Sequence, residues 1–192
     1  MSDFYTLPET LWDRLQARLH GDDREFVVRA YEVARSAHAR QQRFEGTPYI
    51  VHPLRVALML AEREDLAANA PLLAGALLHD VIEDSEVTRD EIAGEFGADV
   101  AEWVQVVTKP RKALRSPDWE DRYYAAIAAA PRSARLIKLA DRLDNVRGLG
   151  SWPRDKQAAY VAETRLRVLP IATQTDSHWA AELACLCSEL EQ

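Results

Sequence analysis

A short segment before the middle of the chain gathers several polar side chains at the end of an apolar run. The segment reads LLAGALLHDVIED over residues 72–84, and its polar members are His79, Asp80, Glu83 and Asp84. Residues four apart share one face of a helix, so His79 would lie above Glu83 and Asp80 above Asp84. Burying carboxylates without a partner is unfavourable. The segment therefore indicates either a bound metal ion beside an acid/base pair, or a helix end whose charges are solvated.

Two residues elsewhere in the chain have the chemistry to complete a metal site. His52 stands before a proline, where a histidine by itself is more typical of a helix cap or a surface residue. Asp141 interrupts an apolar run, where a lone aspartate is also explained by a salt bridge within the core. Together with His79 and Asp80 they offer two imidazoles and two carboxylates. That set suits Mn²⁺, Fe²⁺, Zn²⁺, Co²⁺ or Ni²⁺.

A metal site of this kind could hydrolyse a phosphate ester. A divalent ion with open coordination positions binds a phosphoryl oxygen and lowers the pKa of a bound water molecule. Glu83 and Asp84 lie one helical turn beyond His79 and Asp80. From there, their carboxyl groups could orient or deprotonate the water, or protonate the leaving group.

The segments that must position these residues follow helical periodicity. Asn69 and Pro71 are typical of a helix start, and Pro170 is expected to end a later helix. No segment alternates between apolar and polar residues as a half-buried strand does. The clearest predicted helices cover residues 72–84, 133–148, about 153–172 and 176–191. We therefore expect an all-α fold, with residues 1–192 forming a single domain of about ten helices.

The composition excludes several classes of protein. The 192 residues carry a net charge of −7, which does not favour non-specific binding to nucleic acid. No signal peptide and no apolar run of about 18 residues is present, so we expect no membrane segment and a cytoplasmic location. Cys185 and Cys187 are expected to be free thiols of a reducing compartment. The oligomeric state is left open.

The order His…His-Asp…Asp resembles that of the HD-domain metal-dependent phosphohydrolases. Three longer blocks resemble one branch of that family, the hydrolase domain of the RelA/SpoT homologues, which degrade the alarmone (p)ppGpp. The blocks are AHARQQRFEGTPYIVHPLRVALMLAE (37–62), LLAGALLHDVIEDSEVTRDEIAGEFGADVAEWVQVVTK (72–109) and RLIKLADRLDNVRGL (135–149). The length of the chain resembles that of the stand-alone small alarmone hydrolases.

This resemblance implies an activity and a role for each matching residue. The activity is Mn²⁺-dependent removal of the 3′-pyrophosphate of (p)ppGpp, giving GDP or GTP and pyrophosphate. The implied metal ligands are His52, His79, Asp80 and Asp141, and the implied acidic pair that handles the water is Glu83 and Asp84. Arg43 matches an arginine beside the guanine base, and Asn145 matches an asparagine that contacts the nucleotide sugar.

Other basic residues have more than one interpretation. Lys109 begins a basic run over residues 109–115 that could offset phosphate charge or could form a solvated loop. Lys138 and Arg142 could likewise contact the substrate, support the metal ligands or lie on the surface.

Three positions depart from the family pattern. Phe44 follows the arginine in place of a polar or basic residue, Asp144 stands where His or Tyr is common, and Gly148 where Thr or Asp is common. These departures concern the base and 5′-phosphate pocket, so the alternative is an HD phosphohydrolase acting on pApp, NADPH or a nucleoside monophosphate. A non-catalytic nucleotide-binding or partner module would typically have lost a metal ligand or the acidic pair, and this chain has lost neither.

Overall fold

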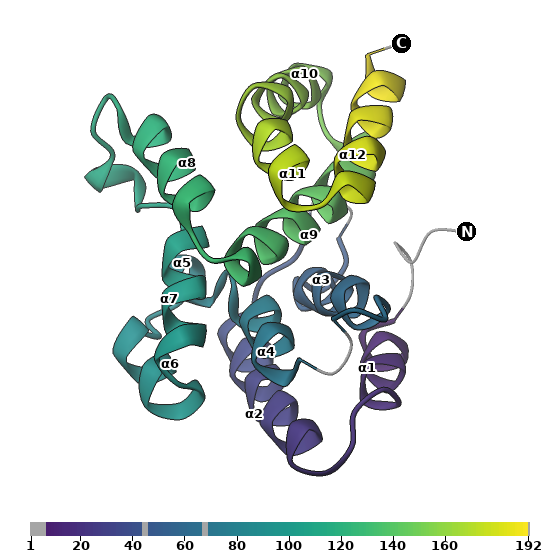
Figure 1. Cartoon of the computed structure of the whole chain (residues 1–192), viewed down its shortest axis with the longest axis vertical. Coiled ribbons are helices and arrows are strands. Elements are labelled where there is room, and N and C mark those ends of the chain that lie inside the picture. Colours follow the sequence, from purple (N-terminus) through teal and green to yellow (C-terminus); the bar gives the residue numbers. More distant parts are fainter. Residues whose placement is uncertain (1–6, 44–45, 67–68, 192) are drawn as a thin grey trace.

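The structure is a computed structural model that describes residues 7–43, 46–66 and 69–191. In these ranges the regular secondary structure is helical, and the single β-type contact there is an isolated bridge between Gln42 and Pro48. Figure 1 shows α9 crossing the middle of the molecule, with α1–α4 on one side and α10–α12 on the other. The prediction of an all-α bundle is confirmed. The helices are α1 (Pro8–Gln16), α2 (Gly21–Ala37), α3 (Val51–Ala61), α4 (Ala70–Leu78), α5 (Val81–Asp84), α6 (Arg89–Phe96), α7 (Ala98–Val107), α8 (Trp119–Ala129), α9 (Arg132–Gly148), α10 (Arg154–Glu163), α11 (Leu169–Thr175) and α12 (Ser177–Leu190).

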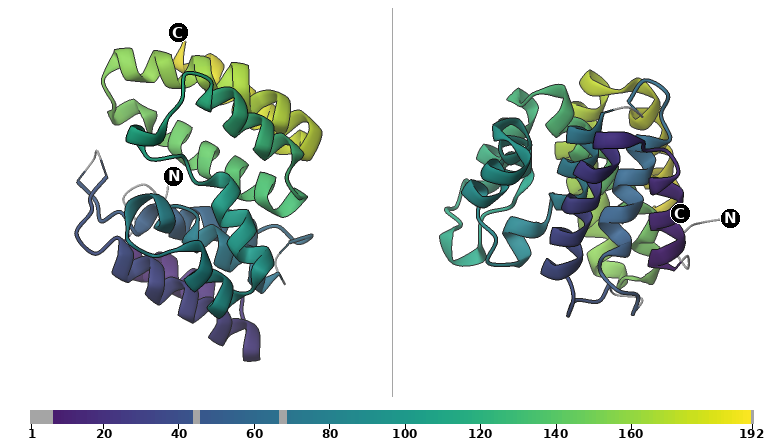
Figure 2. Two further views of the ribbon diagram at one scale, coloured as in Figure 1. Left: turned by 90° about the vertical axis from the view of Figure 1, so that its left-hand side faces the viewer. Right: turned by 90° about the horizontal axis from the view of Figure 1, so that it is seen from below.

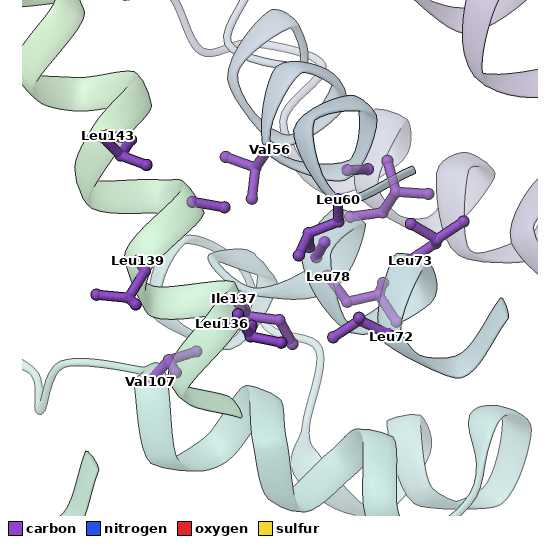
Figure 3. Packing of buried hydrophobic residues seen from close by; sticks show 14 of the residues in the cluster. Val56, Leu60, Leu72, Leu73, Leu78, Val107, Leu136, Ile137, Leu139 and Leu143 are labelled. Atoms are coloured by element: carbon purple, nitrogen blue, oxygen red, sulfur yellow. The ribbon is translucent and has the colours of Figure 1, made fainter. Parts of the chain in front are cut away.

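The core forms where α3, α4 and α9 meet. Figure 3 shows apolar side chains of all three helices packed together, with Val107 of α7 beside them. Fully burying a large apolar side chain stabilises a fold by about 1.5–3 kcal/mol, so this contact holds the three helices in place. Gly75 allows α4 to approach α9 closely, because a Cβ atom there would lie 2.9 Å from Cδ1 of Ile137. Two of the predicted metal ligands lie on α3 and α9, and the other two directly follow α4.

The acidic segment 72–84 is not one continuous helix, which corrects the prediction. Asn69 caps α4 by accepting a hydrogen bond of 3.0 Å from the backbone N–H of Leu72. The helix ends at Leu78, and α5 begins at Val81 after a turn through His79 and Asp80. The backbone N–H of Asp84 still donates to the carbonyl of Asp80 at 3.0 Å. The predicted one-turn relation between these two aspartates therefore holds across the turn.

The predicted helix over 153–172 is also interrupted. α10 ends at Glu163, a π-helical segment covers Thr164–Val168, and α11 begins at Leu169. Pro170 has no N–H to donate to the carbonyl four residues earlier, and it lies in the first turn of α11, where that loss is tolerated. Pro170 therefore begins a helix, and the expectation that it ends one is wrong.

The last three helices form a layer of their own. The left-hand view in Figure 2 shows α10, α11 and α12 gathered on the side of α9 away from α1 and α2. This layer packs on α9, which places its residues behind the segment that carries Asp141. Among the described helices, none combines the length and the apolar character needed to cross a membrane.

Candidate metal centre and the cavity beside it

The four side chains predicted as metal ligands converge on one point between α3, α4 and α9. The Nε2 atoms of His52 and His79 are 3.2 Å apart, and Oδ1 of Asp141 lies 3.3 Å from the former and 3.9 Å from the latter. Oδ2 of Asp80 lies 3.1 Å from Nε2 of His79 and 3.6 Å from that of His52. The ligand atoms of His52, His79 and Asp141 all lie within 4.8 Å of one another. The set is brought together as expected, and its role as a ligand set stays a prediction.

Both histidines turn the same nitrogen toward this point. Nδ1 of His79 donates to the carbonyl oxygen of Ala76 at 2.8 Å, and Nδ1 of His52 donates to Oδ2 of Asp144 at 2.6 Å. Because both partners are acceptors, the proton is assigned to Nδ1, and each Nε2 presents a lone pair. Two lone pairs and two carboxylate oxygens this close repel one another unless a cation lies among them. The donor set therefore fits a divalent metal ion.

The charges around His79 support a cation as well. Burial lowers the pKa of His79, but the negative charges of Asp80 and Asp141 outweigh that effect and raise the pKa to about 9. At neutral pH the metal-free imidazole would therefore hold an extra proton against these carboxylates. A bound divalent cation neutralises the same charges and would release that proton.

Asp141 is fixed by two neighbours on α9. Its Oδ2 accepts from Nζ of Lys138 at 2.8 Å, and its Oδ1 accepts from Nδ2 of Asn145 at 2.5 Å. Burial raises the pKa of Asp141, but the positive charge of Lys138 beside it holds that pKa well below the usual range. With Lys138 5% exposed and Asp141 6% exposed, the pair is a buried ion pair. Lys138 was predicted to contact the substrate, and in the structure its ammonium group forms an ion pair with Asp141.

The predicted acid/base pair lies at the edge of the centre. Glu83 is half-buried, and its Oε2 accepts from the backbone N–H of Lys109 at 3.1 Å. Burial, followed by the charge of Asp80, raises the pKa of Glu83. Asp84 is more exposed, yet desolvation of its carboxyl group and the charges of Asp80 and Glu83 raise its pKa to about 6. A carboxyl group that titrates near neutrality can both give and accept a proton.

A cavity of about 290 Å³ opens beside these groups. Burial, followed by the positive charges of Lys138 and Arg142, lowers the pKa of Lys109 on its wall. Asn145 also lines the cavity and accepts from the guanidinium of Arg43 at 3.3 Å. The wall combines acidic groups (Asp80, Glu83, Asp141), basic groups (Arg43, Lys109, Lys138) and polar or aromatic groups (Gln42, Tyr49, Asn145, Trp152, Tyr160). The arrangement can therefore hold a cation on one side and an anionic group on the other.

Arg142 does not line this cavity. Its side chain is 0% exposed, and its guanidinium lies 4.1 Å from the centre of the Tyr160 ring. It donates to Oγ1 of Thr164 at 3.0 Å, to the hydroxyl of Tyr124 at 2.8 Å and to Oε1 of Glu163 at 3.0 Å. We therefore revise the predicted substrate contact to a structural role, in which Arg142 supports Tyr160 from behind.

Sequence reasoning missed Tyr49 and the aromatic side of the cavity. The hydroxyl of Tyr49 donates to Oδ2 of Asp80 at 2.7 Å, and the rings of Trp152 and Tyr160 meet edge to face at 5.4 Å. The position of Tyr49 three residues before His52 was a usable signal, because Tyr49 lies in the turn that leads into α3 and its carbonyl accepts from the backbone N–H of His52 at 2.9 Å. Phe44, one of the departures from the family pattern, lies outside the described residues.

The fold and the convergence of one histidine from α3, a His-Asp pair after α4 and an aspartate from α9 define the class of protein. A family model described as "HD domain" matches residues 30–172. The chain therefore belongs to the HD-domain family.

Within that family, the chain is similar to proteins of alarmone metabolism. It is 41% identical over 150 residues to a guanosine-3′,5′-bis(diphosphate) 3′-pyrophosphohydrolase of Aquifex aeolicus, covering 77% of this chain and 21% of that protein. It is 39% identical over 176 residues to the bifunctional (p)ppGpp synthase/hydrolase SpoT of Escherichia coli, covering 88% and 24%. The chain thus spans less than a quarter of the length of these curated relatives.

A solved structure of similar size gives a fuller match. It is that of a metazoan orthologue of SpoT described as hydrolysing ppGpp. The TM-score is 0.77 at 26% identity, and the match covers 89% of this chain and 97% of that one. The resemblance predicted from the three sequence blocks is confirmed.

Proposed function

We propose that this chain is a metal-dependent phosphohydrolase that removes the 3′-pyrophosphate of (p)ppGpp, releasing pyrophosphate and GDP or GTP. The names of the relatives from Aquifex aeolicus and Escherichia coli support this substrate. We propose Mn²⁺ as the ion and residues 1–192 as one HD-type domain. The thiols of Cys185 and Cys187, which form no disulfide, are compatible with the cytoplasmic location that belongs to this proposal. The proposed metal ligands are His52, His79, Asp80 and Asp141.

One observation carries the proposal most directly. A centre in which acceptor atoms face one another lies on the same cavity as a basic wall formed by Arg43, Lys109 and Lys138. A cation at the centre and the basic wall would together bind a group that carries several negative charges, as a pyrophosphate does. The aromatic rings of Trp152 and Tyr160 line the same cavity and offer surface for the rest of a nucleotide.

Each group has a proposed role in the reaction. A bound divalent ion supplies Lewis acidity to a phosphoryl oxygen and to the attacking water. Glu83 orients the water and accepts its proton, and Asp84, whose pKa is raised to about 6 by desolvation and by its acidic neighbours, passes protons to and from solvent. Lys109 binds phosphate oxygens, and Lys138 adds positive charge beside them while it holds Asp141. Arg43 lies beside the guanine base. Asn145 contacts the sugar.

The test compares hydrolysis of ppGpp by the Mn²⁺-loaded protein and by two charge-neutral variants. Glu83→Gln keeps the size of the side chain but cannot accept a proton, and we expect kcat to fall by about 10²–10⁴. Glu86→Gln is the matched control, because Glu86 lies two residues beyond the acidic segment and its side chain is 98% exposed. Wild-type turnover in Glu83→Gln would contradict the role of Glu83.

A substrate panel separates the proposal from its alternative. The protein is incubated with ppGpp, pApp, NADPH and a nucleoside monophosphate under one Mn²⁺ condition, and kcat/KM is measured for each. The proposal predicts the highest kcat/KM for ppGpp, with pyrophosphate as the released product. Preference for another member of the panel, with orthophosphate released, would assign the same metal centre to a different nucleotide.

A further inference from the structure

A buried ion pair lies directly behind His52. Asp144 on α9 is 2% exposed and Arg55 on α3 is 4% exposed. Nε of Arg55 donates to Oδ1 of Asp144 at 2.6 Å, and its NH2 donates to Oδ2 at 3.0 Å. This two-point contact fixes the plane of the carboxylate as well as its position.

The same carboxylate holds His52. Oδ2 of Asp144 accepts from Nδ1 of His52 at 2.6 Å, and Nε2 on the opposite side of the ring faces Asp141 at 3.3 Å. His52 and Arg55 lie three residues apart on α3, so both side chains of one helical turn donate hydrogen bonds to Asp144 on α9. The contact therefore fixes both the tautomer and the orientation of the imidazole.

The two histidines of the centre are held in different ways. His79 donates from Nδ1 to the carbonyl of Ala76 within its own segment, a neutral acceptor that every helix provides. His52 donates to a charged carboxylate from another helix, which makes the imidazole more electron-rich and a stronger ligand. An aspartate at position 144 departs from the family pattern. In the structure, the Asp144 side chain lies behind the metal centre and does not line the cavity.

We propose that Asp144, oriented by Arg55, is a positioning residue that sets His52 for metal binding. This inference rests on the metal site of the proposed function and adds two residues to it. An amide at position 144 could not reproduce the arrangement, because it accepts hydrogen bonds at one atom only. If its nitrogen faced His52, it would donate to Nδ1 and move the imidazole proton to Nε2; if it faced Arg55, two donors would meet.

The test measures Mn²⁺ affinity of the metal-stripped protein by titration calorimetry, together with the tautomer of His52 by ¹⁵N NMR of labelled histidine. We expect Asp144→Asn to raise the Kd for Mn²⁺ by about 10–100-fold and to add Nε2–H tautomer at His52. Arg55→Lys keeps the charge but loses the two-point contact, so we expect a smaller rise in Kd. Glu62→Gln is the matched carboxylate-to-amide control, because Glu62 follows the end of α3 and pairs with Arg14 at 2.8 Å on the surface.

The outcomes separate this inference from the proposed function. An unchanged Kd and an unchanged tautomer in folded Asp144→Asn would overturn the inference while leaving the metal site intact. If Asp144→Asn does not fold, Arg55→Lys decides, and wild-type values there overturn the inference in the same way. A folded wild-type protein that binds no Mn²⁺ overturns the metal site itself, and with it this inference. Mn²⁺ binding without ppGpp hydrolysis overturns only the proposed substrate.

Discussion

Replacing Lys138 by methionine distinguishes a buried ion-pair partner from a surface residue that contacts substrate. Nζ of Lys138 lies 2.8 Å from Oδ2 of Asp141 and 5.5 Å from the centre of the Tyr123 ring. Methionine keeps most of the length and the apolar stem but removes the charge. The variant therefore leaves a buried carboxylate without its cation.

The expected loss of stability is large. Removing one partner of a buried ion pair lowers the free energy of unfolding by about 3–5 kcal/mol. For a chain of this size each kcal/mol changes Tm by about 2–4 °C, so Tm of Lys138→Met should fall by about 6–20 °C in the metal-free protein. Added Mn²⁺ should recover part of that loss, because the cation neutralises Asp141 from its other side.

The assay is thermal unfolding followed by circular dichroism, in EDTA and in excess Mn²⁺. Arg35→Met is the matched control, because Arg35 and Glu32 form a pair at the same three-residue spacing with side chains 58% and 51% exposed. Such exposed pairs contribute about 0–1 kcal/mol. If Lys138→Met lowers Tm no more than Arg35→Met does, the structural role of Lys138 is refuted, and substrate contact is its only remaining role.

Three further predictions concern other parts of the site. Tyr49→Phe removes the hydroxyl that donates to Asp80 at 2.7 Å, so the Kd for Mn²⁺ should rise by about 10–100-fold with little change in Tm measured in EDTA. Burial raises the pKa of Glu163, but the charge of Arg142 and the hydrogen bond from Tyr124 have a larger effect, and the net pKa is lowered. The ionised form of Glu163 therefore stabilises the fold above its unfolded pKa of about 4.3. Urea unfolding should thus show the gap between wild type and Glu163→Gln closing as pH falls below that value, and a constant gap would contradict the pairing. Mn²⁺ at 100 times its Kd should add about 2.7 kcal/mol, seen by calorimetry as a rise in Tm of about 5–11 °C, whereas no rise would argue against a metal site in the folded state.

The chemistry of the centre could be predicted from the sequence because residue type and order carry most of it. His79, Asp80 and Asp141 interrupt or end apolar runs, and that local signal does not depend on how the helices pack. His52 by itself gives no such signal, and it was joined to the other three by its chemistry and by the family resemblance. The start of α4 was also predictable, because a capping interaction such as that of Asn69 involves only residues a turn apart.

The partners of these residues could not be predicted, because they depend on contacts between distant segments. Arg55 and Asp144 are 89 residues apart and bond side-on, and nothing in helical periodicity pairs one with the other. Arg142 is adjacent to Asp141 in sequence yet faces the layer of α10–α12, so its burial follows from the packing of that layer on α9.

The most direct test of the proposed activity is product analysis with the purified, Mn²⁺-loaded protein and ppGpp. We predict release of pyrophosphate and formation of GDP in equal amounts, abolished by EDTA and restored by Mn²⁺. Intact ppGpp after prolonged incubation with an excess of folded protein that is shown to hold Mn²⁺ would contradict it.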